Sequence, residues 1–290
     1  MKTERRLRLV EPLPPVEPGF LGPGHTAIEV LRGHSLVDVD PFVLLMDDRI
    51  DIGPTPKQMG GAHPHAGLET VTLVLEGTVD DRDEGKLSAG DALWMTAGRG
   101  VIHSENIEMA GKVRVLQLWI RLPAKARGVA PSFEKIALTS MPIHREPGVE
   151  VRLYSGATHG LRSATLNEAA ITMAEVRLEP GAKTSLDVPR AYNGFLYVLD
   201  GAVGVGGDEV RAGHLGWIDR AGSGSDLTSL TLEGGPSGGR VVAYLGQPQN
   251  EPLVHHGPFV AGDVMEIQSA FRRFRAGEFA PLSTLSPRQI

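Results

Sequence analysis

The chain contains no cysteine among its 290 residues. This absence excludes disulfide bonds, thiolate metal ligands and cysteine nucleophiles, so any transition metal must be held by nitrogen and oxygen donors. Long apolar runs are also missing, since no stretch approaches the ~20 residues that cross a bilayer. Residues 7–10 are too few for the apolar core of an export signal. We therefore expect a cytoplasmic protein without a membrane segment.

Positive charge is not in excess. Lys and Arg number 29 against 35 Asp and Glu, which gives a formal net charge of −6. This balance argues against a broad electrostatic surface for nucleic acid or anionic lipid. With 41% hydrophobic and 22% charged residues, the composition is that of a globular protein. The length is about twice that of a usual domain of roughly 100–150 residues, which favours two domains.

Short runs of β-forming residues alternate with turn formers, since the chain has 36 Gly and 21 Pro. This pattern is typical of an all-β sandwich or barrel. The clearest runs are residues 70–75, 113–118, 170–176, 194–199 and 241–245. Helical periodicity is scarce until the C-terminus. There, Asp263 can cap a helix over residues 263–276, in which apolar residues recur at spacings of three and four.

An internal repeat organises the chain. Residues 74–79 read VLEGTV and residues 198–203 read VLDGAV, an offset of 124. Ala89-Gly90 leads to Trp94, as Ala212-Gly213 leads to Trp217. Two copies of one β-domain explain both matches. We expect an N-terminal barrel within residues 1–135 and a C-terminal barrel with the terminal helix within residues 136–290, joined near residues 142–148.

Four residues stand out by their spacing: His63 and His65 in GAHPHAG, and His103 and Glu105 in GVIHSEN. Strand residues two apart project from the same face, so the two side chains of each pair lie on one face of their strand. If the two segments are neighbouring strands, they form a site of three imidazoles and one carboxylate, which suits a divalent transition metal. For His63 and His65 taken alone, a chance pair of surface histidines is the alternative. Glu69 lies on the same parity as His63 and His65 and competes with Glu105 as the fourth ligand.

The strings HPHAGLETVTLVLEG, GDALWMTAGRGVIHSE and NEPLVHHGPFV resemble the hallmark segments of pirins, which are bicupin proteins. The resemblance implies two tandem cupin barrels of the double-stranded β-helix, or jelly-roll, type. It also implies a single metal, usually iron, with His63, His65, His103 and Glu105 as ligands. Several pirins open the ring of the flavonol quercetin with O2, which implies a quercetin 2,3-dioxygenase activity here.

The resemblance leaves some roles open. Glu105 or Glu69 could act as the general base that takes the substrate hydroxyl proton, and Glu69 could instead support a metal ligand by a hydrogen bond or contact the substrate. Arg99 could stabilise the resulting anion or make a structural ion pair. Residues 79–87 are shorter than the corresponding pirin hairpin, so substrate access could differ.

The second barrel lacks the ligand set, because the offset carries His63 to Asp187, His65 to Pro189 and His103 to the neighbourhood of Asp226. We expect it to be metal-free, and we expect His255 and His256 to be structural. The expected cofactor is one divalent ion, Fe(2+) first, with Mn, Ni, Cu, Co or Zn as alternatives. The expected partners of a monomer are O2 and a small aromatic or enolic substrate. The alternative function is a non-catalytic, iron-dependent redox regulator that binds a protein partner.

Overall fold

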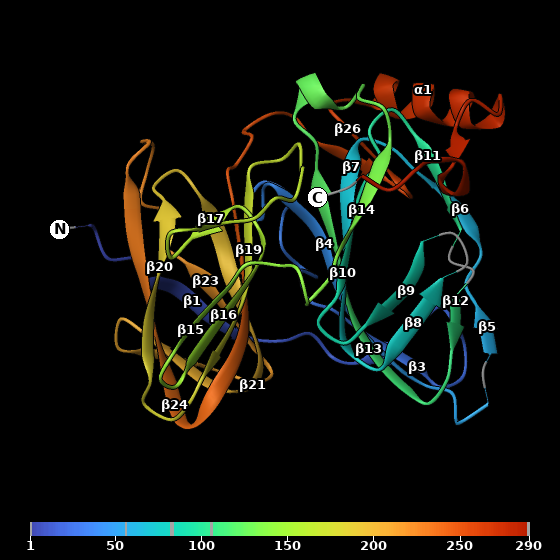
Figure 1. The fold of residues 1–290 in the computed structure, drawn as a ribbon. Coiled ribbons are helices and arrows are strands. Elements are labelled where there is room, and N and C mark those ends of the chain that lie inside the picture. The colour runs from blue at the N-terminus through green and yellow to red at the C-terminus, as the bar shows by residue number, and fades with distance from the viewer. Residues whose placement is uncertain (1, 56, 82–83, 105–106, 289–290) are drawn as a thin grey trace. The chain divides into compact units, whose positions relative to one another are not determined.

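The computed structural model describes residues 2–55, 57–81, 84–104 and 107–288 (Figure 1). Strands form most of both compact units into which the chain divides, and the described residues include a single α-helix, near the C-terminus. Each unit combines segments from distant parts of the sequence. Unit 1 contains residues 1–13, 140–166 and 170–248, and unit 2 contains residues 14–139, 167–169 and 249–290.

Unit 1 is the barrel of the second sequence repeat. Its main sheet has the order β1, β23, β21, β24, β19, β16, β15, while β20 pairs with β24 and β22 pairs with β21. The strands are β1 (Leu7–Pro12), β15 (Ile143–Glu146), β16 (Val149–Ser155), β19 (Ile171–Leu178), β20 (Lys183–Pro189), β21 (Asn193–Val205), β22 (Asp208–Arg211), β23 (His214–Ile218) and β24 (Leu227–Gly246). The short hairpin β17 (Ala157–Thr158) and β18 (Leu161–Arg162) is added to them.

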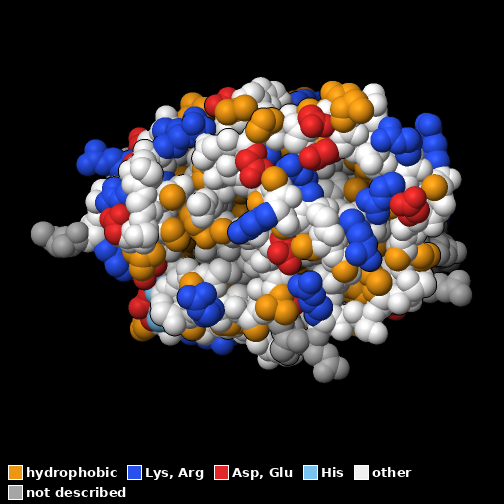
Figure 2. Space-filling model, turned by 90° about the horizontal axis from the view of Figure 1, so that it is seen from above, with side chains coloured by type: hydrophobic (Ala, Val, Ile, Leu, Met, Phe, Trp, Pro, Cys, Tyr) orange, Lys and Arg blue, Asp and Glu red, His pale blue; other side chains and the backbone are white. Residues whose placement is uncertain are grey.

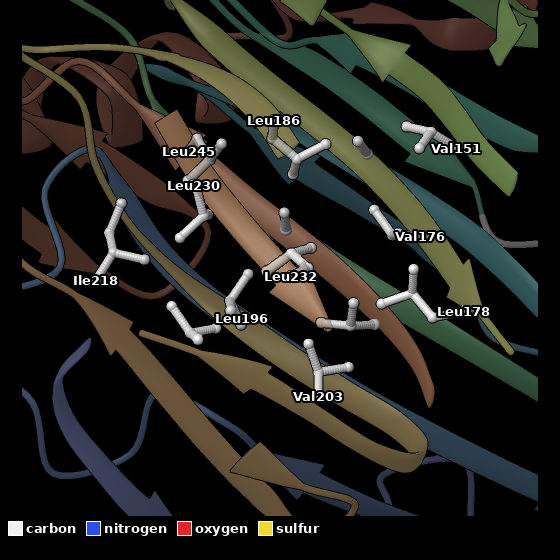
Figure 3. Packing of buried hydrophobic residues seen from close by; sticks show 14 of the residues in the cluster. Val151, Val176, Leu178, Leu186, Leu196, Val203, Ile218, Leu230, Leu232 and Leu245 are labelled. Atoms are coloured by element: carbon white, nitrogen blue, oxygen red, sulfur yellow. The ribbon is translucent and has the colours of Figure 1, made fainter. Parts of the chain in front are cut away.

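The core of unit 1 consists of branched aliphatic side chains from facing strands. Figure 3 shows Leu186, Leu196, Leu230 and Leu232 pointing into the same interior. These four side chains are fully buried. Leu196 comes from β21, while alternate residues of β20 and β24 supply the other three, so one face of β20 and of this part of β24 makes the core and the other faces outward.

Unit 2 is the barrel of the first repeat. Its largest sheet has the order β14, β10, β7, β13, β4, β3, β2, and smaller sheets have the orders β27, β11, β6 and β5, β12, β8, β9. Its strands are β2 (Glu17–Pro18), β3 (His25–Glu29), β4 (Phe42–Asp51), β5 (Lys57–Met59), β6 (Ala62–His65), β7 (Leu68–Glu76), β8 (Thr78–Asp81), β9 (Gly85–Ser88), β10 (Ala92–Thr96), β11 (Val101–Ser104), β12 (Ile107–Met109), β13 (Lys112–Arg121), β14 (Ser132–Ile136) and β27 (Ala280–Pro281).

The C-terminal segment completes unit 2. It contains the hairpin β25 (Val254–His256) and β26 (Phe259–Ala261) and the helix α1 (Val264–Arg275). The predicted helix is confirmed: Asp263 caps it by accepting from the backbone N–H of Glu266 at 2.8 Å. Its buried Ile267 packs with Phe259 and Phe279.

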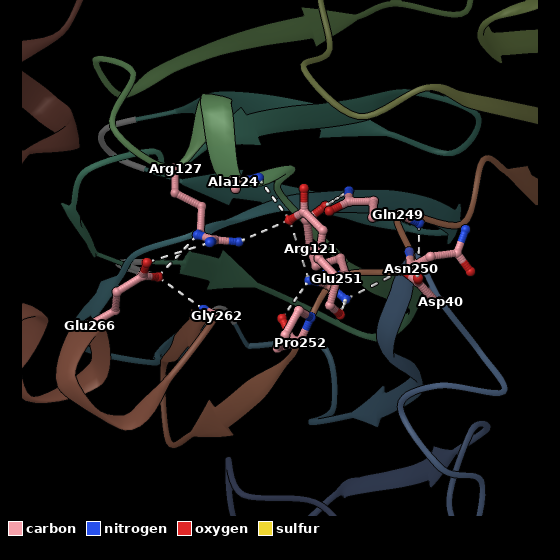
Figure 4. A network of polar contacts seen from close by, with 10 residues as sticks. All are labelled: Asp40, Arg121, Ala124, Arg127, Gln249, Asn250, Glu251, Pro252, Gly262 and Glu266. Atoms are coloured by element: carbon pink, nitrogen blue, oxygen red, sulfur yellow. Dashed lines mark hydrogen bonds and ion pairs between the residues drawn. The ribbon is translucent and has the colours of Figure 1, made fainter.

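A polar network joins the C-terminal segment to the first barrel (Figure 4). The guanidinium of the buried Arg121 donates to the carbonyl oxygens of Glu251 and Pro252, each at 2.9 Å. The carboxylate of Asp40 accepts from the backbone N–H groups of Gln249 and Asn250 at 2.8 Å. Buried charges of both signs therefore hold a segment that is distant in sequence.

The sequence repeat corresponds to a structural repeat. Gly77 follows β7 and Gly201 lies within β21, both with positive φ (77° and 65°), where the chain turns into the return strand. Trp94 on β10 and Trp217 on β23 are both fully buried. The two tandem cupin barrels and the terminal helix predicted from the sequence are thus present.

The segments of each unit differ from the contiguous division predicted at residues 135 and 136. Strand β1 pairs with β23 of unit 1, and α1 packs within unit 2. The physical reason is edge pairing: β1 extends the sheet of the second barrel, whereas Val260 and Leu282 enter the core of the first.

On the face drawn in Figure 2, basic and acidic side chains are interspersed among apolar and neutral ones. In the part of the chain that the structure describes, no helix has the length and apolar character that crossing a membrane requires.

Candidate metal centre

Strands β6 and β11 bring three of the four predicted ligands together. The two strands pair antiparallel with His63 opposite His103 and Val101 opposite His65. The ring centroid of His63 lies 4.8 Å from that of His65 and 5.0 Å from that of His103. The centroids of His65 and His103 are 5.8 Å apart. The alternation of strand residues therefore gathers three imidazoles on one face.

Two of these imidazoles are oriented by bonds at Nδ1. The Nδ1–H of His63 donates to the carbonyl oxygen of Gly61 at 2.9 Å. The Nδ1 of His103 contacts the carboxylate of Glu84, whose side chain is largely buried. A bond of this kind fixes the ring and the tautomer of a metal-binding histidine, leaving Nε2 as the donor.

The third imidazole is held in its neutral form. Burial lowers the pKa of His65 well below its ordinary value, and the neighbouring rings of His103 and His63 lower it further, while the carbonyl of Pro258 opposes the shift. The Nδ1 of His65 is buried away from solvent. A neutral imidazole is the form that binds a metal ion.

The chemistry of this donor set fits a divalent transition metal. Within the described ranges, however, no group of three His, Asp or Glu side chains is arranged to hold an ion as it stands. Glu105, the predicted fourth ligand, lies outside the described residues.

Glu69 is placed away from the imidazoles. Its fully buried carboxylate accepts from the hydroxyl of Thr96 at 2.9 Å and from the backbone N–H groups of Glu168 and Ala169 at 2.8 and 3.3 Å. Burial raises the pKa of Glu69 to about 7, against the opposing effect of these donors and of Trp94. These contacts differ from the expectation that Glu69 points the same way as His63 and His65, and its role as a ligand or base stays a prediction.

The reason for this difference is Gly67, between β6 and β7. Its φ is +77°, and a Cβ at this position would lie 1.8 Å from the carbonyl oxygen of Val260. The strand alternation that carries His63 and His65 is therefore broken before Glu69. The predicted parity assumed one continuous strand.

Arg99 is also separate from the imidazoles. It lines a recess with Arg127, Arg273 and residues of α1, and its backbone carbonyl accepts from Arg273 at 2.7 Å. The exposed His256 packs edge-on against Phe271 of the helix, with ring centroids 5.7 Å apart.

A cavity of about 960 Å³ opens beside the three imidazoles. Its walls combine apolar and aromatic side chains with a few polar groups. Among its lining residues are Phe20, Leu44, Met46, Trp119, Asp48 and Gln117. The ring of Trp119 meets that of His65 edge-on at 5.1 Å. Such a lining suits a flat aromatic molecule with a small number of hydroxyl or carbonyl groups.

Sequence reasoning missed Glu84, Asp48 and Gln117. Glu84 lies in the segment of residues 79–87, which is shorter than the corresponding pirin hairpin. This difference in length was the available signal for Glu84. Asp48 and Gln117 face the cavity from β4 and β13, where Asp48 pairs with Val115 and Met46 with Gln117. Only the pairing of distant strands shows that they line the same cavity as the histidines.

Comparison with known proteins places the chain in a family. The family model described as pirin matches residues 25–120, and that of the pirin C-terminal cupin domain matches residues 173–280. The chain belongs to the pirin family. It is 32% identical to the pirin of Homo sapiens over 251 residues, covering 83% of each chain.

Two further relatives of this pirin-family chain cover nearly its whole length. A putative quercetin 2,3-dioxygenase of Vibrio cholerae is 31% identical over 292 residues, 96% of this chain and 99% of the relative. A crystal structure of quercetin 2,3-dioxygenase from Acinetobacter baumannii matches with a TM-score of 0.82 and 26% identity, over 96% of this chain and 99% of that one. The family, the bicupin fold and a relationship to proteins named as dioxygenases are therefore established together.

Proposed function

We propose that the first barrel holds one divalent transition metal, iron first among the candidates, and that the chain is a dioxygenase for quercetin or a similar flavonol or enolic substrate. His63, His65 and His103 are the proposed ligands, with Glu105 as the fourth. The observation that carries the proposal is the convergence of three imidazoles beside a cavity with aromatic walls. The relatives named as quercetin 2,3-dioxygenases support the substrate class.

A bound divalent ion would supply a positive charge for a deprotonated substrate oxygen and a redox centre for O2. The remaining tasks belong to the chain. Glu84 and the carbonyl of Gly61 orient two imidazoles through Nδ1. Trp119 and Phe20 offer ring faces and edges to an aromatic substrate, and the apolar wall displaces water around it.

The test is metal analysis with O2 uptake on quercetin, measured on the same samples. His63→Ala and Glu105→Ala should each lose the single equivalent of metal, and O2 uptake with it, because removing one donor from a four-ligand set weakens binding by orders of magnitude. His256→Ala is the matched control, since its exposed imidazole lies on β25 and is not a proposed ligand. Metal retained in both ligand variants would show that the site is misplaced.

A second candidate is a non-catalytic regulator whose metal redox state changes its affinity for a protein. The second barrel favours it, because residues corresponding to the ligand positions serve structural ion pairs there. Asp187 pairs with Lys2, and Asp226 pairs with Arg190 at 2.7 Å. Identical partners captured by the ferrous, ferric and metal-free forms would contradict this role.

A further inference from the structure

Asp48 and His25 form a fixed polar pair that opens onto the cavity beside the histidines. The Nε2 of His25 lies 2.8 Å from Oδ1 of Asp48, and the His25 side chain is fully buried, whereas Asp48 keeps 13% of its side chain exposed. Asp48 lines the same cavity as His63, His65 and His103. The pair lies outside the ligand set.

The hydrogen bonds around His25 determine its tautomer. The backbone N–H of Leu21 donates to Nδ1 of His25 at 3.1 Å, so this nitrogen carries its lone pair. The proton of the neutral ring is therefore on Nε2 and is donated to Oδ1 of Asp48. Because Oδ1 is engaged as an acceptor, the second oxygen, Oδ2, is the one that can meet a ligand. No bond to Oδ2 is found among the described residues.

The turn before β3 is built around this imidazole. Gly19 lies against the His25 ring so closely that a Cβ at residue 19 would be 2.2 Å from Nδ1. The Phe20 ring then meets His25 edge-on at 5.4 Å, and Phe20 itself is 76% exposed where it lines the cavity. One turn thus fixes the carboxylate's partner and supplies an aromatic wall for the cavity.

A donor lies close to this acceptor on the neighbouring strand. The hydroxyl of Thr72 donates to Oε1 of Gln117 at 2.7 Å, which turns the Gln117 amide N–H group away from Thr72. Gln117 pairs with Met46 and Asp48 with Val115, so the two are diagonal neighbours on β13 and β4. Both line the cavity with the imidazoles.

We propose that Asp48 accepts the proton of a substrate hydroxyl group, that His25 positions Asp48, and that Gln117 donates to a carbonyl or hydroxyl oxygen of the same molecule. The substrate class is an aromatic enol or phenol that also carries an oxygen acceptor. In the step, the substrate O–H bond breaks and an O–H bond forms on Oδ2, so the substrate becomes an enolate or phenolate and no electron is transferred. This inference rests on the proposed function for its substrate class, but binding can be tested without turnover.

The experiment titrates 3-hydroxyflavone into the protein without O2, in metal-free and metal-loaded form, and follows the long-wavelength absorbance of the flavonol anion. Asp48→Asn keeps an oxygen for the His25 N–H but cannot take a proton. We expect it to bind at least about tenfold more weakly in both forms and to show a smaller fraction of the flavonol anion in the metal-loaded protein. Asp51→Asn is the matched control, because it removes the same charge from an exposed position on β4. It should behave as the wild type does.

His25→Gln tests positioning. We expect the fraction of bound flavonol present as the anion to fall while metal content stays unchanged. If Asp48→Asn does not fold, the wild type is titrated with 3-methoxyflavone, which should bind at least about tenfold more weakly than 3-hydroxyflavone. Equal affinity for these two ligands, or equal affinity and anion band in Asp48→Asn and wild type, overturns the inference.

The outcomes separate the two proposals. A wild type that consumes O2 with quercetin, combined with unaltered binding by Asp48→Asn, leaves the proposed function standing and overturns the role of Asp48. Loss of binding in Asp48→Asn without any O2 uptake by the wild type supports Asp48 and contradicts the dioxygenase. A wild type that binds no 3-hydroxyflavone contradicts both.

Discussion

At the scale of single residues, the surroundings of a carboxylate decide whether it serves the site or the fold. Glu69 is fully buried and bonded to Thr96 and two backbone N–H groups, whereas Asp48 keeps 13% of its side chain exposed and lines a cavity. The two residues have the same functional group, but only Asp48 shares a space with the imidazoles. Glu69 therefore affects stability first, and its effect depends on pH.

The buried Glu69 should make the protein less stable as the pH rises from 4.5 to 7. Its pKa of about 7 in the folded state lies above the value of 4.5 for an unperturbed carboxyl. The contribution of Glu69 to the free energy of unfolding is therefore fully present below the unfolded-state pKa and is lost as the pH rises through the folded-state pKa. The loss amounts to about 3 kcal/mol in total. Urea unfolding of wild type and Glu69→Gln between pH 4.5 and 8 measures this: the variant should lack this part of the decline.

The control for this series is Glu76→Gln, which changes an exposed carboxylate at the end of the same strand. It should leave the pH dependence of unfolding as in the wild type. Equal pH slopes for Glu69→Gln and the wild type would contradict the assignment.

At the scale of elements, the helix and the paired ligand strands could be predicted because their causes are local. Asp263 and the apolar spacing after it define α1, and the histidine spacing on β6 and β11 places the rings together. The direction in which the Glu69 side chain points could not be predicted, because it depends on a turn at Gly67 whose backbone closely approaches Val260. Asp48 and Gln117 were missed because they reach the cavity through the pairing of distant strands, and Glu84 was missed because its contact with His103 joins two segments that are separate in sequence.

The attachment of the C-terminal segment to the first barrel should depend on Arg121. Arg121→Met should lower the free energy of unfolding by about 3 kcal/mol, because it leaves the carboxylate of Asp40 and two carbonyl oxygens buried without their cation. Burial already raises the pKa of Asp40, so the carboxylate has little solvent to replace the guanidinium. Urea unfolding gives the free energy, and limited proteolysis reports on residues 249–290.

Arg49→Met is the comparison for this variant. Arg49 pairs with Asp47 at 3.0 Å from a side chain that is 47% exposed, and Asp47 keeps two bonds to Arg114. Arg49→Met should lower the free energy of unfolding by less than about 1 kcal/mol. Equal destabilisation by both substitutions would show that the buried contacts of Arg121 stabilise the protein no more than the exposed ion pair of Arg49 does.

At the scale of the whole molecule, the sequence contains two successive repeats, but each barrel also takes in a segment from the opposite end of the chain. The first barrel takes Val260 and Leu282 into its core from the C-terminal segment, and Phe259 and Phe279 pack in the cluster beside it. The second barrel takes β1 from the N-terminus, and the fully buried Arg5 donates to Asp219 at 2.6 Å and to the carbonyl of Tyr192 at 3.2 Å. Each barrel is complete only with residues from the opposite end of the chain.

Neither contiguous half should therefore fold alone. Residues 1–135 lack the buried Phe259, Val260 and Leu282, and losing three such side chains, at about 2–5 kcal/mol each, is comparable to the whole 5–15 kcal/mol that stabilises a domain. Residues 136–290 lack β1 and leave an edge of β23 unpaired. We expect poorly dispersed amide NMR spectra and no cooperative urea transition for either half. Mixing the halves should restore both signals, because each then receives its missing segment, whereas a cooperative transition in an isolated half would show that its barrel does not need the other end of the chain.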